Sequence, residues 1–463
     1  MNQKYERASM WQIIRYGFGG VGSNVAAVFV MTYAATFFTN YLGISPLAMG
    51  ALLLAPRLVD AFFNPFVGII SDRTRTRMGR FRPYIIFGAP VMGLSLMLLF
   101  INWGMTGSSI LVFCYVLYIL HVLAAALVDI PYHSLTPLMT EDPNQRTTVA
   151  ITKQFMGFIA IIPVLVVVPL LLSSYPGNPM VFTYSAIAVA VIITISYWIC
   201  AHGAKKKDTL QRIERFEGPA AKKSKISFGK QLQVIFKNRA LLMLMIAFGT
   251  DFVAAGAVSG IGIYYFRDVV GNVALASLGG LLPMVVGIPV MFLLTPVTKK
   301  FGKKSVFIFG STTQMIVAIS LFFIPSQAIT LILVQAALAG LFMPLTAVLG
   351  WAMAADCVEY GEWVSGINAA GTVTSQVTFI NKLGNAIGGF LLGLLLAVGG
   401  YNAQLAVQAQ QTQTMIIAIR SLLPALGFLA SIISMAFYPI TKDKYDVIIK
   451  ENEQRRALKL NNQ

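Results

Sequence analysis

Twelve long apolar runs are the feature that most constrains how this chain can fold. A helix needs about 20 mostly apolar residues to cross a bilayer, and the runs have about this length or more. They form two sets of six. The runs lie near residues 14–39, 46–71, 83–102, 109–136, 150–173 and 180–203, and then near 239–265, 274–297, 304–323, 327–353, 370–398 and 412–440. The sequence therefore predicts an all-α integral membrane protein with twelve transmembrane helices.

The charge content agrees with this class. Only 11% of the residues are charged, against about 25% in soluble globular chains. The net charge of +17 could suggest a nucleic-acid partner, but the lysines and arginines cluster in short loops between apolar runs. That placement is typical of membrane orientation. We therefore expect the lipid bilayer as a partner and no nucleic acid.

The basic loops predict the topology. The loop after the second run, "SDRTRTRMGRFRP", carries five arginines, and "TKKFGKKS" after the eighth carries four lysines. Loops such as "NYLGIS" and "SSYPGNPM" carry neither residue. Because positive loops stay in the cytoplasm, we expect both termini on the cytoplasmic side of the cell (plasma or inner) membrane.

The chain divides into four predicted parts. They are an N-terminal six-helix half (1–203), a polar cytoplasmic linker (204–238), a C-terminal six-helix half (239–440) and a cytoplasmic tail (441–463). A weak repeat links the halves: "PFVGIISDRTRTRMGRFRPY" and "PVTKKFGKKSVF" occur at matching places. Two repeats of six helices are a common transporter design.

Enzyme signatures are missing from the sequence. Cys114, Cys200 and Cys357 form no CxxC pair, so neither a disulfide framework nor a zinc site is expected. The stretch "GFGGVG" begins a membrane span instead of following a strand, which argues against dinucleotide binding. We expect no catalytic residues, no metal site and no enzyme activity.

Polar groups inside the second span suggest a site. A charged residue at mid-membrane costs roughly 2.5–3.5 kcal/mol, so such residues usually face a wet cavity or a partner. Arg57, Asp60 and Asn64 are spaced i, i+3 and i+7, on one face of a helix. Asp60 and Asn64 could offer oxygens to the same small cation or proton site.

The fourth and fifth spans repeat the pattern. Asp129 and His133 are four residues apart, and Lys153 begins the next span. If this face and the face of Asp60 both point inward, two carboxylates and an amide surround one cavity, with a lysine nearby. Isolated polar residues in other spans are Asn24, Lys382 and Arg420.

Structural interpretations of these residues remain open. Asp60 could simply pair with Arg57 as a bridge. The amide of Asn64 could satisfy backbone groups freed by Pro65, and that of Asn24 could serve helix packing. The other open interpretations are a packing role for His133, a purely structural role for Lys382 and a snorkelling Arg420.

Three longer stretches carry a family resemblance. They are "RLVDAFFNPFVGIISDRTRTRMGRFRPY", "VDIPYHSLTPLMTEDPNQR" and "AADCVEYGEWVSGINAAGTVTSQVTFINKLGNAIGG". Together they resemble the glycoside–pentoside–hexuronide:cation symporters, a family that includes the melibiose and glucuronide permeases. The resemblance runs over nearly the whole chain and implies the major-facilitator fold.

The resemblance also implies roles for matching positions. Asp60 matches a cation-site carboxylate, and Asp129 matches a carboxylate shared between sugar and cation. The positions implied at the sugar site are Asn24, Asp129, His133, Lys153, Thr378 and Lys382.

Two departures from the family thin the cation site. Asn64 stands where sodium-using members have a second aspartate, and Phe63 stands where the melibiose permease has an asparagine. Sodium wants several hard oxygens, by analogy with other hard cations. Asp60 and Asp129 can still hold a proton, which favours proton over sodium coupling.

The predicted function is cation-coupled symport of a glycoside, pentoside or hexuronide into the cell by alternating access. Asn24 is neutral where the melibiose permease has a charged aspartate at its sugar site. Lys153 and Lys382 are present here, and this combination favours an anionic sugar. We expect a monomer that needs no cofactor beyond the coupling H+ or Na+. The alternatives are an uncoupled sugar facilitator, a sugar sensor that does not transport, a membrane transferase and a multidrug exporter.

Overall fold

The computed structural model describes residues 7–140, 143–209, 236–366 and 370–461. Within these ranges all the named elements are helices. The chain divides into two compact units. Unit 1 is essentially Met1–Ser224, and unit 2 is essentially Lys225–Gly271, Leu278–Tyr401 and Val407–Gln463. The division falls inside the segment that the sequence predicts as a linker.

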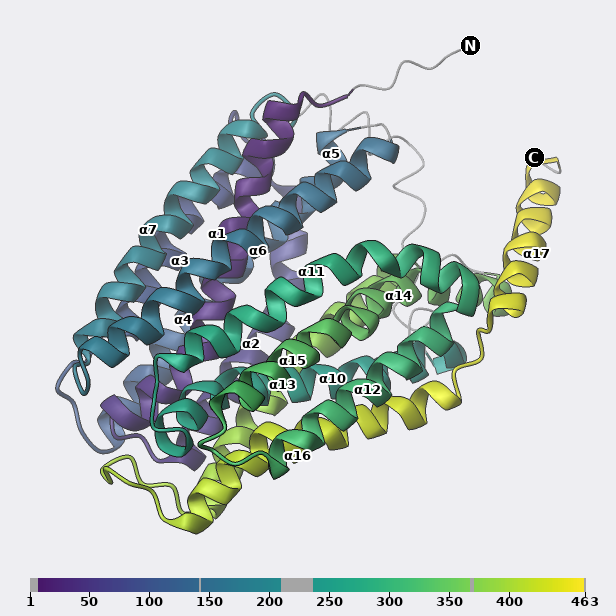
Figure 1. Cartoon of the computed structure of the whole chain (residues 1–463). Coiled ribbons are helices and arrows are strands. Elements are labelled where there is room, and N and C mark those ends of the chain that lie inside the picture. The colour runs from purple at the N-terminus through teal and green to yellow at the C-terminus, as the bar shows by residue number, and fades with distance from the viewer. Residues whose placement is uncertain (1–6, 141–142, 210–235, 367–369, 462–463) are drawn as a thin grey trace. The chain divides into compact units, whose positions relative to one another are not determined.

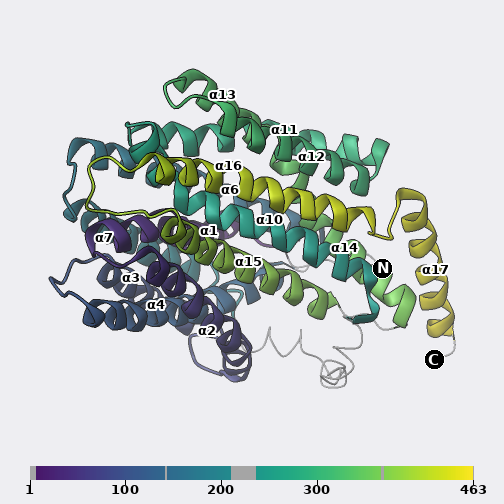
Figure 2. The same cartoon turned by 90° about the horizontal axis from the view of Figure 1, so that it is seen from below.

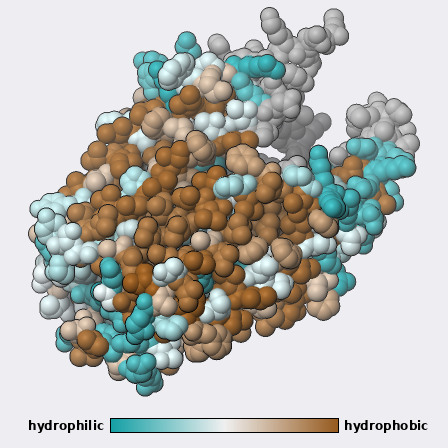
Figure 3. All heavy atoms as spheres, viewed as in Figure 1, coloured by the Kyte–Doolittle hydropathy of each residue, from teal (hydrophilic) through white to brown (hydrophobic). Residues whose placement is uncertain are grey.

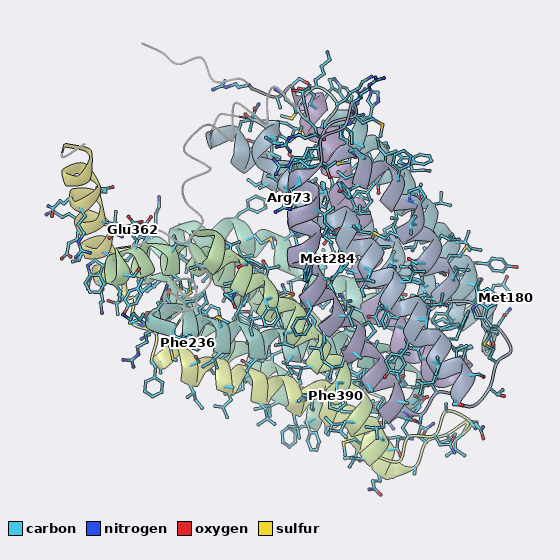
Figure 4. All side chains as sticks on the ribbon, turned by 180° about the vertical axis from the view of Figure 1, so that it is seen from behind. Arg73, Met180, Phe236, Met284, Glu362 and Phe390 are labelled. Carbon is cyan, nitrogen blue, oxygen red and sulfur yellow. The ribbon has the colours of Figure 1, made fainter. Side chains whose placement is uncertain are left out.

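Unit 1 contains eight named helical elements in its described residues (Figure 1). They are α1 (Met10–Thr36), the π-helix η1 (Phe37–Tyr41), α2 (Pro46–Arg73), α3 (Arg82–Leu99), α4 (Ser108–Ser134), the short α5 (Thr136–Met139), α6 (Pro143–Ser174) and α7 (Met180–Gly203). Arg73 ends α2 beside the basic loop, whereas Met180 begins α7 after an uncharged loop, at a different end of the unit (Figure 4).

Unit 2 follows a similar order. Its elements are α10 (Arg239–Tyr264), the π-helix η2 (Tyr265–Val269), α11 (Leu275–Phe301), α12 (Lys303–Phe323), α13 (Ile329–Phe342), α14 (Pro344–Ser365), α15 (Ala370–Val398), α16 (Gln410–Ala436) and the polar α17 (Lys442–Asn461). In Figures 1 and 2, α10, α15 and α16 lie side by side.

The spans predicted from hydropathy are confirmed. The described residues contain 12 helical segments long and apolar enough to cross a membrane. The α13 and α14 helices together make one of them, Ile329–Ser365. Figure 3 shows why this composition needs a bilayer: hydrophobic side chains cover most of the visible helix surface, and hydrophilic ones gather at the helix ends and on α17.

The repeat that the loops only suggested is clear in the helices. In each unit the first helix runs into a five-residue π-helix, η1 or η2. In each unit that first helix also packs on the fifth and sixth spans: α1 on α6 and α7, and α10 on α15 and α16. Because π-helices are rare in proteins, their matched positions relate the two units.

Glycines bring the central helices of each unit into close contact. A Cβ at Gly20 of α1 would lie 2.4 Å from the Lys153 carbonyl oxygen of α6. A Cβ at Gly388 of α15 would lie 2.2 Å from the Val253 carbonyl oxygen of α10. No side chain fits at either distance, so these backbones approach as closely as glycine allows, as small residues permit in membrane helices.

This packing yields a prediction about stability. We expect Gly388→Ala to lower the free energy of unfolding by about 1–3 kcal/mol, the usual cost of overpacking. Gly68→Ala is the matched control, because a Cβ at Gly68 would meet nothing within 4 Å. Thermal unfolding of the purified protein in detergent measures both. Equal midpoints for the two variants would contradict the close α10–α15 contact.

Candidate functional site

The polar face of α2 carries one acid and one amide inside the span. Asp60 is buried, with 4% of its surface exposed. One turn later, the Oδ1 atom of Asn64 is buried without a hydrogen-bond partner in the structure. A buried carbonyl-type oxygen without a donor is an energetic cost. It is also an acceptor available to a cation or to a protonated carboxyl group.

Arg57 connects this face to α4. Its guanidinium donates a hydrogen bond to the Tyr118 hydroxyl and lies within electrostatic reach of Asp60 and Asp129. The side chains of α2 and α4 therefore converge, which the spacing of the residues in the sequence left open. A guanidinium near two carboxylates acts as a built-in cation and offsets part of the cost of burying them.

Asp129 is surrounded by further polar groups. The Tyr197 hydroxyl of α7 donates a hydrogen bond to Asp129 Oδ1, and the Lys153 ammonium lies within electrostatic reach. This carboxylate therefore interacts with groups from α2, α6 and α7. The hydrogen bond from Tyr197 fixes one oxygen of Asp129 and directs the carboxylate.

Lys153 forms the other side of the cluster. Its Nζ lies 2.7 Å from His133 Nδ1 and 5.0 Å from the centre of the Tyr132 ring. Lysine can only donate, so in this contact the imidazole nitrogen accepts and His133 is neutral at Nδ1. The His133 side chain is exposed, so the Lys153–His133 pair borders an accessible surface.

The cluster is balanced in charge. Its two acids, Asp60 and Asp129, lie near two basic groups, Arg57 and Lys153. A group that neutralises either acid therefore leaves one of these cations without a counter-charge. The electrostatic interaction between Asp60 and Arg57 is compatible with a cation-binding role, because the guanidinium can be exchanged for an incoming cation.

Asn24 is placed differently. Its Nδ2 donates to the Gly20 carbonyl oxygen at 2.8 Å, and a Cβ at Gly157 of α6 would lie 2.5 Å from the same Nδ2. The amide nitrogen is thus packed between α1 and α6. This arrangement supports the helix-packing interpretation that the sequence left open for Asn24.

The remaining predicted residues belong to unit 2. Thr378 and Lys382 lie one turn apart on α15, and the Thr378 hydroxyl donates to the Thr374 carbonyl oxygen at 2.9 Å. On α16, the Arg420 guanidinium lies 4.9 Å and 5.2 Å from the ring centres of Tyr265 and Phe266. Arg420 is therefore stabilised by aromatic rings of η2, where the sequence suggested snorkelling.

Sequence reasoning missed Tyr118, Tyr197 and Asp251. Tyrosines are common in membrane helices, so no local signal separates the two that contact Arg57 and Asp129. Asp251 was visible as an acid inside the apolar run "AFGTDFVAAG" and met the same criterion as Asp60. The described residues contain no group of three or more His, Cys, Asp or Glu side chains that could hold a metal ion.

The coupling between Lys153 and Asp129 can be measured without a substrate. We expect Lys153→Met and Asp129→Asn to be non-additive in unfolding free energy by about 0.5–3 kcal/mol, as for neighbouring charges. As a control, Lys153→Met combined with Lys299→Met should be additive within about 0.5 kcal/mol, because Lys299 is an exposed residue in the last turn of α11. If the effects of Lys153→Met and Asp129→Asn on the unfolding free energy were additive, these two residues would not be coupled.

Comparison with known proteins identifies the family and the fold of this chain. The profile of the family described as MFS/sugar transport protein matches residues 15–442. A glucuronide carrier protein homolog of Escherichia coli is 29% identical over 99% of this chain and 98% of its own length. An isoprimeverose transporter of Lactiplantibacillus pentosus is 30% identical over 96% of this chain and 91% of its own length.

Solved structures are similar in fold at low sequence identity. The nucleoside transporter NupG matches with a TM-score of 0.64 at 13% identity, over 91% of this chain and 98% of that chain. The xylose transporter XylE of Escherichia coli matches with a TM-score of 0.62 at 13% identity, over 93% and 97%. The predicted resemblance is confirmed: the chain belongs to the MFS/sugar transport protein family and is a membrane protein with the major-facilitator fold, similar over its length to sugar and glycoside symporters.

Proposed function

We propose that this protein couples the entry of protons to the uptake of an anionic sugar, such as a hexuronide or an acidic glycoside. The observation that carries the proposal is the balanced cluster of Arg57, Asp60, Asp129 and Lys153. Sugar transport follows from the family. The coupling ion, the charge of the sugar and the inward direction are our inference from the cluster and from the basic loops.

The donor set of the cluster favours a proton over sodium. A hard cation needs several oxygen ligands, and here Arg57 already lies near both carboxylates. A sodium ion would have to share these oxygens with the Arg57 guanidinium. A proton needs only one carboxylate oxygen. After protonation of Asp60 or Asp129, Arg57 keeps the other acid and the Tyr118 hydroxyl as partners.

The same charge balance links the proton to the sugar. Lys153 is near Asp129 and is hydrogen-bonded to the exposed His133. Once Asp129 is protonated, the Lys153 ammonium lacks a counter-charge. A sugar carboxylate can then replace it, with a gain of about 1.5–3 kcal/mol for a charged hydrogen bond. The proton therefore binds first and strengthens the binding of an anionic sugar.

Alternating access completes the proposal. We place both termini in the cytoplasm, because the basic loops follow the positive-inside rule. One proton and one monovalent sugar anion carry no net charge together. The pH gradient then drives accumulation, and each tenfold sugar gradient requires about 1.4 kcal/mol. A neutral sugar would instead draw about 2.3 kcal/mol per 100 mV from the membrane potential.

Transport into proteoliposomes tests the coupling. We expect an inward proton gradient of about one pH unit, acidic outside, to support roughly tenfold accumulation of labelled glucuronide. A sodium gradient or an imposed membrane potential should not increase this accumulation further. Asp60→Asn should abolish accumulation against a gradient, and Asp443→Asn, an exposed acid of α17, should leave it unchanged. Unaltered accumulation in Asp60→Asn would refute the role of Asp60.

Other outcomes point to the alternatives. Stimulation of accumulation by a sodium gradient instead of a proton gradient would show that sodium is the coupling ion. Equilibration without accumulation under every gradient would indicate a facilitator. Sugar binding without any transport would indicate a sensor.

The substrate assignment has its own test. We expect Lys153→Met to raise the KM for glucuronide by about 10-fold to 100-fold, the loss of a charged hydrogen bond, and to leave the KM for a neutral glycoside within about twofold. Lys299→Met, an exposed lysine of α11, is the matched control and should change neither. An equal rise for both sugars would show that Lys153 does not recognise the acid.

A further inference from the structure

An isolated acid lies inside unit 2. Both carboxylate oxygens of Asp251, on α10, are buried and have no hydrogen-bond partner in the structure. Ser431 of α16 is a neighbouring polar group, and its hydroxyl is likewise buried without a partner. The Ser431 hydroxyl is therefore within interaction distance of the Asp251 carboxyl group, although their geometry is not that of a regular hydrogen bond. The proposed mechanism uses neither residue.

Close packing of α10 and α16 seals this acid. A Cβ at Gly427 of α16 would lie 3.0 Å from the Thr250 carbonyl oxygen and 3.3 Å from the Cβ of Ala254. Thr250 lies immediately before Asp251, and Ala254 lies nearly one turn after it. Gly427 is one turn before Ser431. The two helices are thus in contact around the carboxyl group, and they run together in Figures 1 and 2.

No cation in the described part of unit 2 offsets the acid. The face that α15 presents to α10 includes Ile380, Gly384, Asn385 and Gly388, none of which is a cation. The arginines of α16 and η2 have other partners: Arg420 lies over aromatic rings, and Arg267 is paired with Asp268 at 2.8 Å. The ionisable groups on the elements packed against α10 are Asp356, Cys357, Glu359, Tyr360, Glu362, Lys382, Arg420, Tyr265, Arg267 and Asp268, with Arg239 and Tyr264 on α10 itself.

Most of these groups are engaged at the ends of the unit. Asp356 is paired with Lys303 of α12 at 2.6 Å, and the Glu359 carboxylate accepts from Asn452 of α17 at 3.1 Å. Glu362 lies at the same end of unit 2 as Phe236, near α17, as Figure 4 shows. Asp251 differs from Asp268, Asp356 and Glu359. It lies in the middle of a span, and neither of its carboxylate oxygens has a regular hydrogen bond.

A bare carboxylate is costly in this position. Burying an uncompensated charge costs several kcal/mol in proteins, and a charge at mid-membrane costs roughly 2.5–3.5 kcal/mol. A proton removes that charge and turns one oxygen into a donor. The Ser431 hydroxyl rotates freely and can accept from it. Sodium would need several oxygens, and this place offers one carboxyl group and one hydroxyl.

The other unit shows that the fold does not require an acid here. Ser23 and Asp251 both lie 14 residues before the start of their π-helices (37 − 23 and 265 − 251). Ser23 of α1 is hydrogen-bonded to Tyr197 of α7, as Asp251 of α10 neighbours Ser431 of α16. A small neutral hydroxyl therefore serves the packing at this position of the repeat. The acid in unit 2 needs a reason other than packing.

We propose that Asp251 is a proton-binding site in unit 2, separate from the cluster around Asp60 and Asp129. Asp251 holds its proton while α10 and α16 are closed around it. Release of the proton requires water to reach the carboxyl group, so it accompanies separation of these two helices. The site goes beyond the proposed symport mechanism and would stand if that mechanism used sodium.

Infrared spectroscopy of the protein in lipid bilayers tests this directly. A protonated carboxyl group gives a carbonyl stretch that an ionised one lacks. We expect the wild-type spectrum to contain such a band at neutral pH, and Asp251→Asn and Asp251→Ser to lack it. Serine is the second variant because it stands at the matching position of unit 1, so its helix packing is expected to survive. Asp443→Asn should retain the band.

The outcomes separate this site from the symport mechanism. Asp60→Asn should keep the Asp251 band even where it abolishes accumulation. The band should also exchange slowly in heavy water, because the carboxyl group is sealed. Spectra of wild type and both Asp251 variants that are identical at neutral pH would overturn the proposal. So would a band that titrates away with the exposed acids.

Discussion

The cost of placing charge in hydrocarbon governs this structure. An ionisable side chain inside a span must be paired, protonated or hydrated, and the three solutions can be told apart by neighbours. In unit 1, Arg57 lies near Asp60 and Asp129, and Lys153 adds a second cation beside Asp129. The result is a neutral group of four charges. Its members come from α2, α4 and α6, and the single charges that α4 and α6 contribute are each compensated by a charge on another helix.

Helix packing sets the precision of that group. Gly20 lets α1 contact the backbone of α6 at Lys153 itself. Gly157 of α6 leaves the space in which the Asn24 amide packs. The position of the Lys153 ammonium therefore depends on two glycines that have no polar function. The hydrogen bond from Tyr197 then orients Asp129 from the opposite side. Close packing and charge compensation are thus parts of one arrangement.

The two units share one helix arrangement but hold different charged groups in it. Each begins with a helix that ends in a π-helix and packs on the fifth and sixth spans. In unit 1 the hydroxyl of Ser23 has a tyrosine partner on the sixth span. In unit 2 the matching position is an acid that neighbours only a neutral hydroxyl on the sixth span, that of Ser431. A duplicated fold can therefore carry a compensated cluster in one copy and a solitary acid in the other.

The amino-acid sequence by itself determined the class of the protein and most of its candidate residues. Hydropathy set the twelve spans, because span length follows from bilayer thickness. The spacing of Arg57, Asp60 and Asn64 placed them on one helix face, because the helical period is fixed. Only the tertiary structure decided which faces meet. It brought Tyr118 and Tyr197 to the charges, turned Asn24 to the backbone of its own helix, and placed Asp251 beside the neutral hydroxyl of Ser431. Arg57 and Tyr118, like Asp129 and Tyr197, are more than 60 positions apart in the sequence, so no local period encodes their contacts.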